Sequence, residues 1–292
     1  MKPQKPALWV SHSSIGDFLS CPRAYYIRHV YKDPKTNHKV TLINPALALG
    51  QIVHQVLEAL SVLPADERLK EPLIEQYNKA WEQITGELGG FSSKEQELEY
   101  KNRGAIMINR VMFHPGPITE KAVKLVSPDN LPPRYFLSKE EDIILCGKID
   151  WLEYLPSDDG VNIIDFKTGM NSEKEESLQL PIYMLLVKNC QNRKVSGISY
   201  WYLEKENEPT QMPMPDIQKA HDMVLTIALQ MKEARAKKEF KCPRGGCFVC
   251  KPLEKILTGE AKFIGTSDYQ DIYIIPPIEN PKEIPVVDVI PF

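Results

Sequence analysis

The strongest constraint on the fold comes from two short apolar segments whose acidic residues lie fifteen positions apart. The first reads Gly-Lys-Ile-Asp and ends at Asp150; the second reads Ile-Ile-Asp-Phe-Lys-Thr-Gly over residues 163–169. In a strand, residues two apart face the same side, so Asp165 and Lys167 would point together. Two adjacent strands would then join two carboxylates and one ammonium group. Ordinary salt-bridged carboxylates at hairpin ends are the alternative interpretation.

Two carboxylates beside a lysine suit chemistry on phosphodiesters. Hard divalent cations such as Mg²⁺ prefer oxygen ligands, which Asp150 and Asp165 would supply. A nearby ammonium group, that of Lys167, would orient the attacking water and offset charge on the phosphate. The sequence therefore predicts a hydrolytic metal site at the ends of two strands.

The surrounding segments predict an αβββαβ core. In chain order the predicted elements are a helix at 46–57, a strand at 118–126, a strand that ends at Asp150, a strand at 163–167, a helix at 177–187 and a strand at 197–203. The first helix carries His54, and the first strand has Glu120 near its start. On the second helix Gln179 and Tyr183 are four residues apart, so they share one face.

In this order of elements and side chains the sequence resembles the PD-(D/E)XK nuclease superfamily, in particular its RecB-like branch. That branch includes the nuclease domains of RecB and AddB and the CRISPR-associated RecB-like exonucleases. The resemblance covers roughly residues 10–255 and implies an α/β, restriction-endonuclease-like fold with a mixed central sheet. The family's site positions fall, in the expected order, on His54, Glu120, Asp150, Asp165, Lys167, Gln179 and Tyr183.

The resemblance also implies roles for these residues. Asp150 and Asp165 would bind Mg²⁺ or Mn²⁺ together with the backbone carbonyl of Phe166. His54 would complete the coordination sphere and favour Mn²⁺, because imidazole suits the softer ion; a buried core histidine is the alternative. Lys167 would orient and help deprotonate the attacking water.

Three further positions have supporting roles in this scheme. Glu120 would support a second metal ion or a metal-bound water. Gln179 and Tyr183 would either hydrogen-bond the substrate backbone or fix Lys167.

The cysteines make a second argument, and there are six of them. Cys242, Cys247 and Cys250 form one tight group, whereas Cys21 lies far upstream in a Cys-Pro-Arg context. No apolar signal segment follows the first residues and no run approaches a membrane span, so we expect a cytoplasmic protein with reduced thiols. Clustered thiols then favour a metal over disulfides. The remaining two, Cys146 and Cys190, have apolar neighbours and are expected to be small buried side chains.

In the RecB-like branch, one N-terminal and three C-terminal cysteines often hold a [4Fe-4S] cluster that joins the two ends of the chain. Cys21 fits the N-terminal ligand. The C-terminal group departs from the usual pattern, because no cysteine follows Cys250 and Cys242 lies upstream instead. We therefore expect Cys242 to supply the missing ligand. Zinc is the alternative, since four thiolates suit both.

Length and proline content indicate one domain with additions. The 292 residues suit one large domain or a core with a helical insertion. The resemblance then implies a single nuclease domain over 1–265, with the insertion at about 64–114 and the cysteine cluster at 242–250. Further helices are predicted at 13–30, with a Ser14–Asp17 capping box, and at 67–86, 93–113 and 217–240. Residues 266–292 are rich in proline and predict a C-terminal extension, either an edge strand or an extended arm.

The net charge of −3 means that a nucleic acid would have to meet a local basic surface. Two clusters qualify, although each is also compatible with a solvated charged face: Lys32, Lys35, His38 and Lys39, and Arg235, Lys237, Lys238, Lys241 and Arg244.

Three classes of function remain compatible with these patterns. The first is a metal-dependent DNA nuclease, in particular an exonuclease on single-stranded or frayed ends in recombination, repair or CRISPR spacer processing, with helicase, recombination or CRISPR adaptation proteins as partners. The second is a non-catalytic DNA-binding or assembly subunit, and the third is a redox protein. The chain has no phosphate-binding Gly-x4-Gly-Lys motif, which excludes an ATP-driven helicase on this chain.

Overall fold

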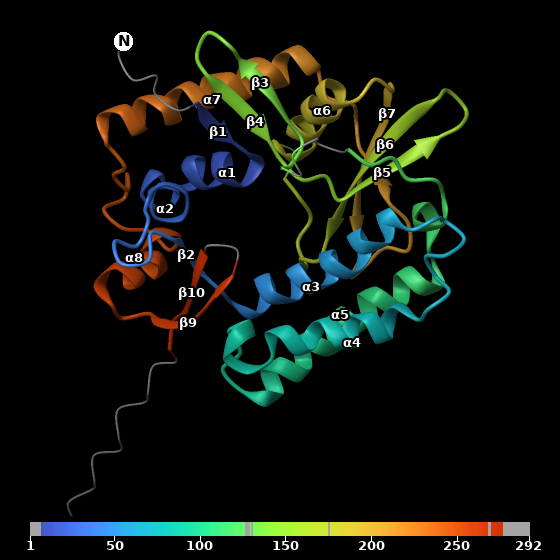
Figure 1. Cartoon of the computed structure of the whole chain (residues 1–292), viewed down its shortest axis with the longest axis horizontal. Helices are drawn as coiled ribbons and strands as arrows, with labels where there is room; N and C mark the ends of the chain where they lie inside the picture. The colour runs from blue at the N-terminus through green and yellow to red at the C-terminus, as the bar shows by residue number, and fades with distance from the viewer. Residues whose placement is uncertain (1–6, 126–128, 130, 175, 268–269, 277–292) are drawn as a thin grey trace, which may run out of the picture.

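The computed structural model describes residues 7–125, 129, 131–174, 176–267 and 270–276 of the chain (Figure 1). Its main sheet has the strand order β5–β6–β7–β8, with β5 at Trp151–Leu155, β6 at Gly160–Lys167, β7 at Val195–Tyr202 and β8 at Thr210–Gln211. The sheet is mixed, because β6 is antiparallel to β5 and parallel to β7. This mixed α/β architecture is consistent with the fold that the sequence predicts.

Strand β6 is buried on both faces because both carry apolar side chains. Val161 and Ile163 belong to a core shared with helix α6, Gln179–Cys190. Ile164 and Phe166 belong to a second core shared with helix α3, Pro45–Ala59. The alternation of a strand therefore turns Asp165 and Lys167 toward α6 and the Phe166 ring toward α3.

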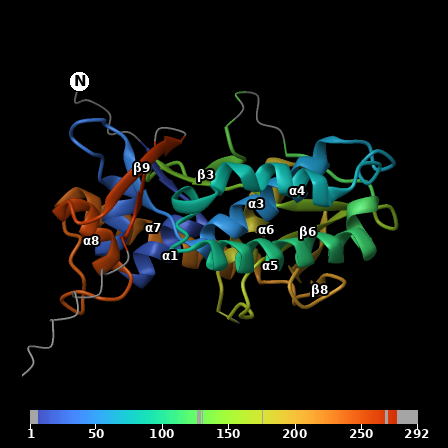
Figure 2. The ribbon, with the colours of Figure 1, turned by 90° about the horizontal axis from the view of Figure 1, so that it is seen from below.

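Helix α3 begins at residues that favour a helix N-terminus. The side chain of Asn44 accepts a hydrogen bond from the Leu47 N–H, and Pro45 occupies the first turn. Helices α4, Leu73–Trp81, and α5, Lys94–Phe113, pack against α3 and cover it on the side away from α6 (Figures 1 and 2). They form the helical segment expected at about 64–114, although α4 is shorter than the helix predicted at 67–86.

Two smaller sheets join the N-terminal part of the chain to the hairpin at 134–146 and to the C-terminal hairpin. Strand β1, Leu8–Val10, pairs with β4, Ile143–Cys146, which also pairs with β3, Arg134–Ser138. Strand β2, Lys39–Leu42, pairs with β10, Gln270–Ile274, which forms a hairpin with β9, Lys262–Ser267. The boundary expected at residue 265 falls within β9, so the described start of the extension consists of strands; residues 277–292 lie outside the described part.

Helix α7, Ile217–Lys237, leads into the cysteine segment, and helix α8, Cys250–Thr258, follows it. A third apolar core joins these parts; it contains Cys21, Cys247 and Cys250 together with Val40 and Leu253. Within the described ranges, no helix has both the length and the apolar character needed to cross a membrane.

Of the predicted strand at 118–126, the described residues form only a short pairing with β5 at 121–123, where the Tyr154 N–H donates to the Lys121 carbonyl oxygen and the Val123 N–H donates to the Leu152 carbonyl oxygen. A 3₁₀ turn spans Gly116–Thr119, and only Ala122 makes a β-bridge, to Glu153. Proline at 115 and 117 favours the turn. The buried Arg68 also binds the carbonyl oxygens of Ile118 and Glu120, which removes them from a strand ladder.

Three other local predictions need correction. The helix predicted at 13–30 is interrupted: α1 is His12–Ser20, α2 is Pro22–Tyr25, and a π-helix spans Tyr26–Val30. Cys21 is extended between the first two, because Pro22 has no N–H to continue α1. The capping box joins Ser11 and Ser14 rather than Ser14 and Asp17. Asp150 also does not end a strand; it directly precedes β5.

Candidate metal centre and active site

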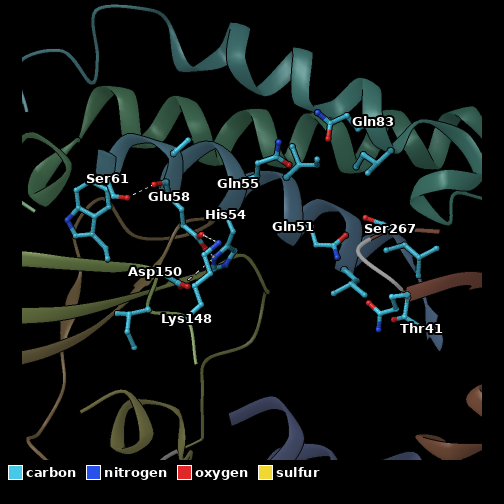
Figure 3. A pocket seen from close by; sticks show the side chains of 18 of the residues that line it. Thr41, Gln51, His54, Gln55, Glu58, Ser61, Gln83, Lys148, Asp150 and Ser267 are labelled. Atoms are coloured by element: carbon cyan, nitrogen blue, oxygen red, sulfur yellow. Dashed lines mark hydrogen bonds and ion pairs between the residues drawn. The ribbon is translucent and has the colours of Figure 1, made fainter. Parts of the chain in front are cut away.

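Helix α3 and the segment before β5 bring an imidazole and two carboxylates together. His54, Glu58 and Asp150 each offer a ligand atom, and these atoms all lie within 4.8 Å of one another. The His54 Nδ1 lies 3.3 Å from Glu58 Oε1 and 3.5 Å from Asp150 Oδ2. Figure 3 shows the three side chains converging in a cleft. This group (the acidic triad) has the donor set of a divalent metal site.

Local sequence explains how these residues meet. His54 and Glu58 are four residues apart on α3 and therefore share one helix face. Asp150 follows Gly147, where an added Cβ would lie 2.9 Å from Leu186 Cδ1 of α6. Glycine thus allows this segment to pass closely over α6. The Phe166 N–H then donates a 2.9 Å hydrogen bond to Asp150 Oδ2, which fixes the carboxylate at the end of β6.

The triad strongly favours positive charge at its centre. Burial disfavours the imidazolium form of His54, but hydrogen bonds to Asp150 and Glu58, and their negative charges, outweigh burial and raise the His54 pKa to about 10. A divalent cation would satisfy the same negative potential. Glu58 Oε2 is buried and is already paired with one cation, the exposed side chain of Lys148.

Asp165 and Lys167 lie beside the triad and form an ion pair. The Lys167 Nζ is 2.9 Å from Asp165 Oδ2 and 3.0 Å from Glu173 Oε1, in the loop before α6. Gln179 holds both partners: its Nε2 donates a 2.6 Å hydrogen bond to Asp165 Oδ1, and its Oε1 accepts one from Lys167. Tyr183 extends this network, because its hydroxyl oxygen accepts a 3.3 Å hydrogen bond from the Gln179 Nε2.

Asp165 is almost fully buried, with 1% of its surface exposed. Burial and the nearby charge of Asp150 raise its pKa to about 7, although Lys167 opposes that rise. Its Oδ2 lies 2.9 Å from the Lys167 Nζ, the one cation with which the carboxylate is paired among the described residues. A buried carboxylate whose pKa is raised by a neighbouring carboxylate is the second observation that fits a bound cation, because a cation would offset both negative charges.

The structure therefore brings together six of the residues predicted from the sequence: His54, Asp150, Asp165, Lys167, Gln179 and Tyr183. Glu120 does not join them. Its side chain is exposed and its carbonyl oxygen is bound by Arg68. Phe166 contributes its N–H to Asp150, while a role for its carbonyl oxygen as a metal ligand remains a prediction. Gln179 and Tyr183 are buried behind Asp165, which places them as supports for the ion pair.

Glu58 and Glu173 were missed by the sequence analysis. Glu58 had a signal, because it lies one helical turn after His54 and therefore on the same helix face. Glu173 had none, since it lies in an irregular loop.

A cleft of about 1000 Å³ extends from the triad along α3. Lys148 lies at the triad end, and Gln51 continues the α3 wall, as Figure 3 shows. At the far end the wall is formed by Thr41 of β2 and Ser267 of β9. The cleft thus reaches from the acidic triad to the C-terminal hairpin, which is long enough to give the site an extended binding surface.

A second candidate metal site lies between the chain ends. Cys21, Cys242, Cys247 and Cys250 form a group whose sulfur atoms all lie within 4.8 Å of one another. All four are free thiols. Burial raises the pKa of Cys21 to about 12, whereas the backbone N–H groups of Cys250 and Val249 lower that of Cys247 to about 6. Cys146 and Cys190 lie outside this group and are half-buried.

Comparison with known families agrees with this arrangement. The model of the PD-(D/E)XK nuclease superfamily matches residues 9–251, which include both candidate metal sites. The chain belongs to this superfamily.

Glu58 gives a direct test of the acidic triad. Glu58→Gln is expected to weaken Mn²⁺ binding roughly 10-fold or more, because it keeps the shape of the side chain and removes one anionic oxygen ligand. Calorimetric titration of the protein with Mn²⁺ would measure this effect. Gln55→Ala, one residue from His54 on the same helix, is the matched control and should bind Mn²⁺ like the wild type. Equal affinity of Glu58→Gln and wild type would remove Glu58 from the site.

Proposed function

We propose that this protein is a metal-dependent DNA nuclease that acts on single-stranded or frayed DNA ends as an exonuclease. The observation that carries the proposal is the ion pair of Lys167 with the buried Asp165. The Asp165 carboxylate interacts electrostatically with Asp150 and His54, two members of the triad that lines one end of the cleft. This is the combination of ligands and positive charge that phosphodiester hydrolysis requires.

His54, Glu58 and Asp150 would hold the ion, and Asp165 would join them from the buried side. A bound Mn²⁺ or Mg²⁺ supplies Lewis-acid activation of the phosphate and of the attacking water. Histidine among the ligands favours Mn²⁺. The contribution of Lys167 is to orient the attacking water and to offset the charge that develops on the phosphate. Gln179 positions Lys167 by holding its ammonium group and the carboxylate of Asp165 at once.

The cleft supports a single strand as substrate. Its volume of about 1000 Å³ is that of a site for a few nucleotides. Its neutral polar wall, which includes Gln51, Thr41 and Ser267, can hydrogen-bond bases and backbone without demanding one sequence. A role in recombination, repair or CRISPR spacer processing, beside helicase or adaptation proteins in the cytoplasm, is what the RecB-like resemblance implies.

We further propose that the four cysteines hold a structural metal centre. The RecB-like resemblance implies a [4Fe-4S] cluster. The spacing of the sulfurs also suits zinc, because Cys247 Sγ and Cys250 Sγ are 3.7 Å apart, close to the edge of a tetrahedron of about 2.3 Å Zn–S bonds. A four-iron cluster is larger than one ion and would require the sulfurs to lie farther apart. Iron, sulfide and zinc analysis of protein purified without oxygen distinguishes the two.

The nuclease proposal predicts complete dependence on a divalent metal. Protein treated with a chelator should leave end-labelled single-stranded DNA intact, and added Mn²⁺ or Mg²⁺ should restore cleavage, because the acidic triad alone repels the phosphate. The size of the labelled products over time gives the polarity: mononucleotides from one labelled end support an exonuclease. Binding of DNA without cleavage at any metal concentration would instead favour a non-catalytic platform.

A further inference from the structure

One aromatic side chain is presented outward by the cysteine segment. Phe248 is 79% exposed although it lies between Cys247 and Cys250, which are both buried. The backbone around it is compact: Gly245 and Gly246 have φ of 64° and 133°, in the region that favours glycine. The Cys247 N–H donates to Cys250 Sγ at 3.2 Å, and the Lys251 N–H donates to the Cys247 carbonyl at 2.9 Å. The segment thus holds Phe248 in a defined position.

Basic side chains surround this phenylalanine in the sequence and along the turn. Lys241, Arg244 and Lys251 are exposed, and none forms an ion pair with another described residue. A Cβ at Gly246 would lie 3.1 Å from Lys251 Cε, so the lysine stem lies against the turn itself. Of the acidic groups nearby, Glu254 is paired with Arg23 and Glu239 is exposed. The local charge is therefore positive in a chain whose net charge is −3.

This surface is separate from the candidate active site. The segment between α7 and α8 lies at the opposite end of the molecule from β5 and β6 (Figures 1 and 2). None of its residues lines the cleft. The exposed Phe248 and its cations are therefore not explained by hydrolysis at the acidic triad.

We propose that Phe248, Lys241, Arg244 and Lys251 form a second contact for a single-stranded nucleic acid, outside the cleft. Phe248 stacks on an unpaired base, and the three cations contact phosphates. Sequence-tolerant binding of single strands relies on this pairing of an aromatic face with positive charge. The centre of a protein–protein interface is instead depleted of charged side chains, which makes a protein partner the poorer occupant. The inference rests on the proposed nucleic-acid substrate, and it adds a site that the substrate reaches only when it is long.

The test compares two equally exposed phenylalanines. Phe248→Ala should weaken binding of a long single-stranded oligonucleotide at least about fivefold, as expected for the loss of one stacked base. The matched control is Phe113→Ala; Phe113 is 78% exposed at the end of α5 and should be replaceable without effect. Binding is measured by fluorescence anisotropy without added Mn²⁺ or Mg²⁺, so that cleavage is not supported and the proposed metal of the cysteine group is not removed. Phe248→Trp should restore binding, because an indole also stacks.

Two further measurements separate a nucleic-acid contact from a change in folding. A short oligonucleotide that fills only the cleft should bind Phe248→Ala and wild type alike. Arg244→Ala should reduce the dependence of log K on log salt by about 0.7, the value for one phosphate on a single strand. If Phe248→Ala binds the long oligonucleotide like wild type, or loses the short one equally, the proposal is overturned. These outcomes do not depend on cleavage, so a failure of the nuclease proposal is seen separately, in the cleavage assay.

Discussion

Lys167→Met is expected to lower the rate of DNA cleavage roughly 10³-fold while the protein stays folded and still binds Mn²⁺. The ammonium group is held by Asp165, Glu173 and Gln179. It is therefore positioned before substrate arrives, and a positioned charge is where the largest catalytic effects arise. Methionine keeps the apolar stem, whose end lies over the Tyr200 ring with Nζ 4.9 Å from the centroid.

The control for this variant is a second lysine in the same site region. Lys148 forms an ion pair with Glu58, but its side chain is 73% exposed. Lys148→Met should change the cleavage rate far less, because an exposed charge is screened by water. Single-turnover rates at saturating Mn²⁺ compare the two variants, and circular dichroism confirms folding. Cleavage by Lys167→Met at the wild-type rate would show that Asp165 and Lys167 are only a structural ion pair.

Local patterns were enough to predict the part of the site that lies within single elements. Asp165 and Lys167 lie on one side of β6 because side chains alternate between the two faces of a strand. Gln179 and Tyr183 lie on one face of α6 because residues four apart are neighbours on a helix surface. Both rules depend on spacing alone. The existence of β6 was likewise predicted from its apolar run, whereas its burial on both faces is seen only in the structure.

Features that depend on distant contacts could not be predicted in this way. Glu120 was predicted to lie on a strand, but Arg68, far away in sequence, binds its carbonyl oxygen. Glu58 had the correct helical spacing from His54, yet only the approach of Asp150 distinguishes it from a solvated helix glutamate. Cys242 was assigned to the cysteine group because it was the remaining nearby cysteine; its place beside Cys21 depends on how the chain ends pack.

Cys21→Ala is expected to lower the thermal midpoint by on the order of 10 °C, because it removes one of four ligands from the proposed metal centre. The four cysteines connect the α1–α2 region to α8, which is far away in sequence. Three of them, Cys21, Cys247 and Cys250, belong to the third apolar core, which is small. Such a core buries little apolar surface, so a bound metal would supply much of its stability. Calorimetry and metal analysis of the same samples would measure both effects.

Two comparisons separate metal loss from simple side-chain truncation. Cys190→Ala removes a half-buried thiol outside the group, and should keep the metal and shift the midpoint by only about 1–2 °C. Wild type stripped of its metal should melt at about the same temperature as Cys21→Ala, because the two have lost the same bonds. If Cys21→Ala retains its full metal content, or melts like Cys190→Ala, the four thiols do not form a metal centre. In that case the contact between the chain ends depends on apolar packing by Val40 and Leu253.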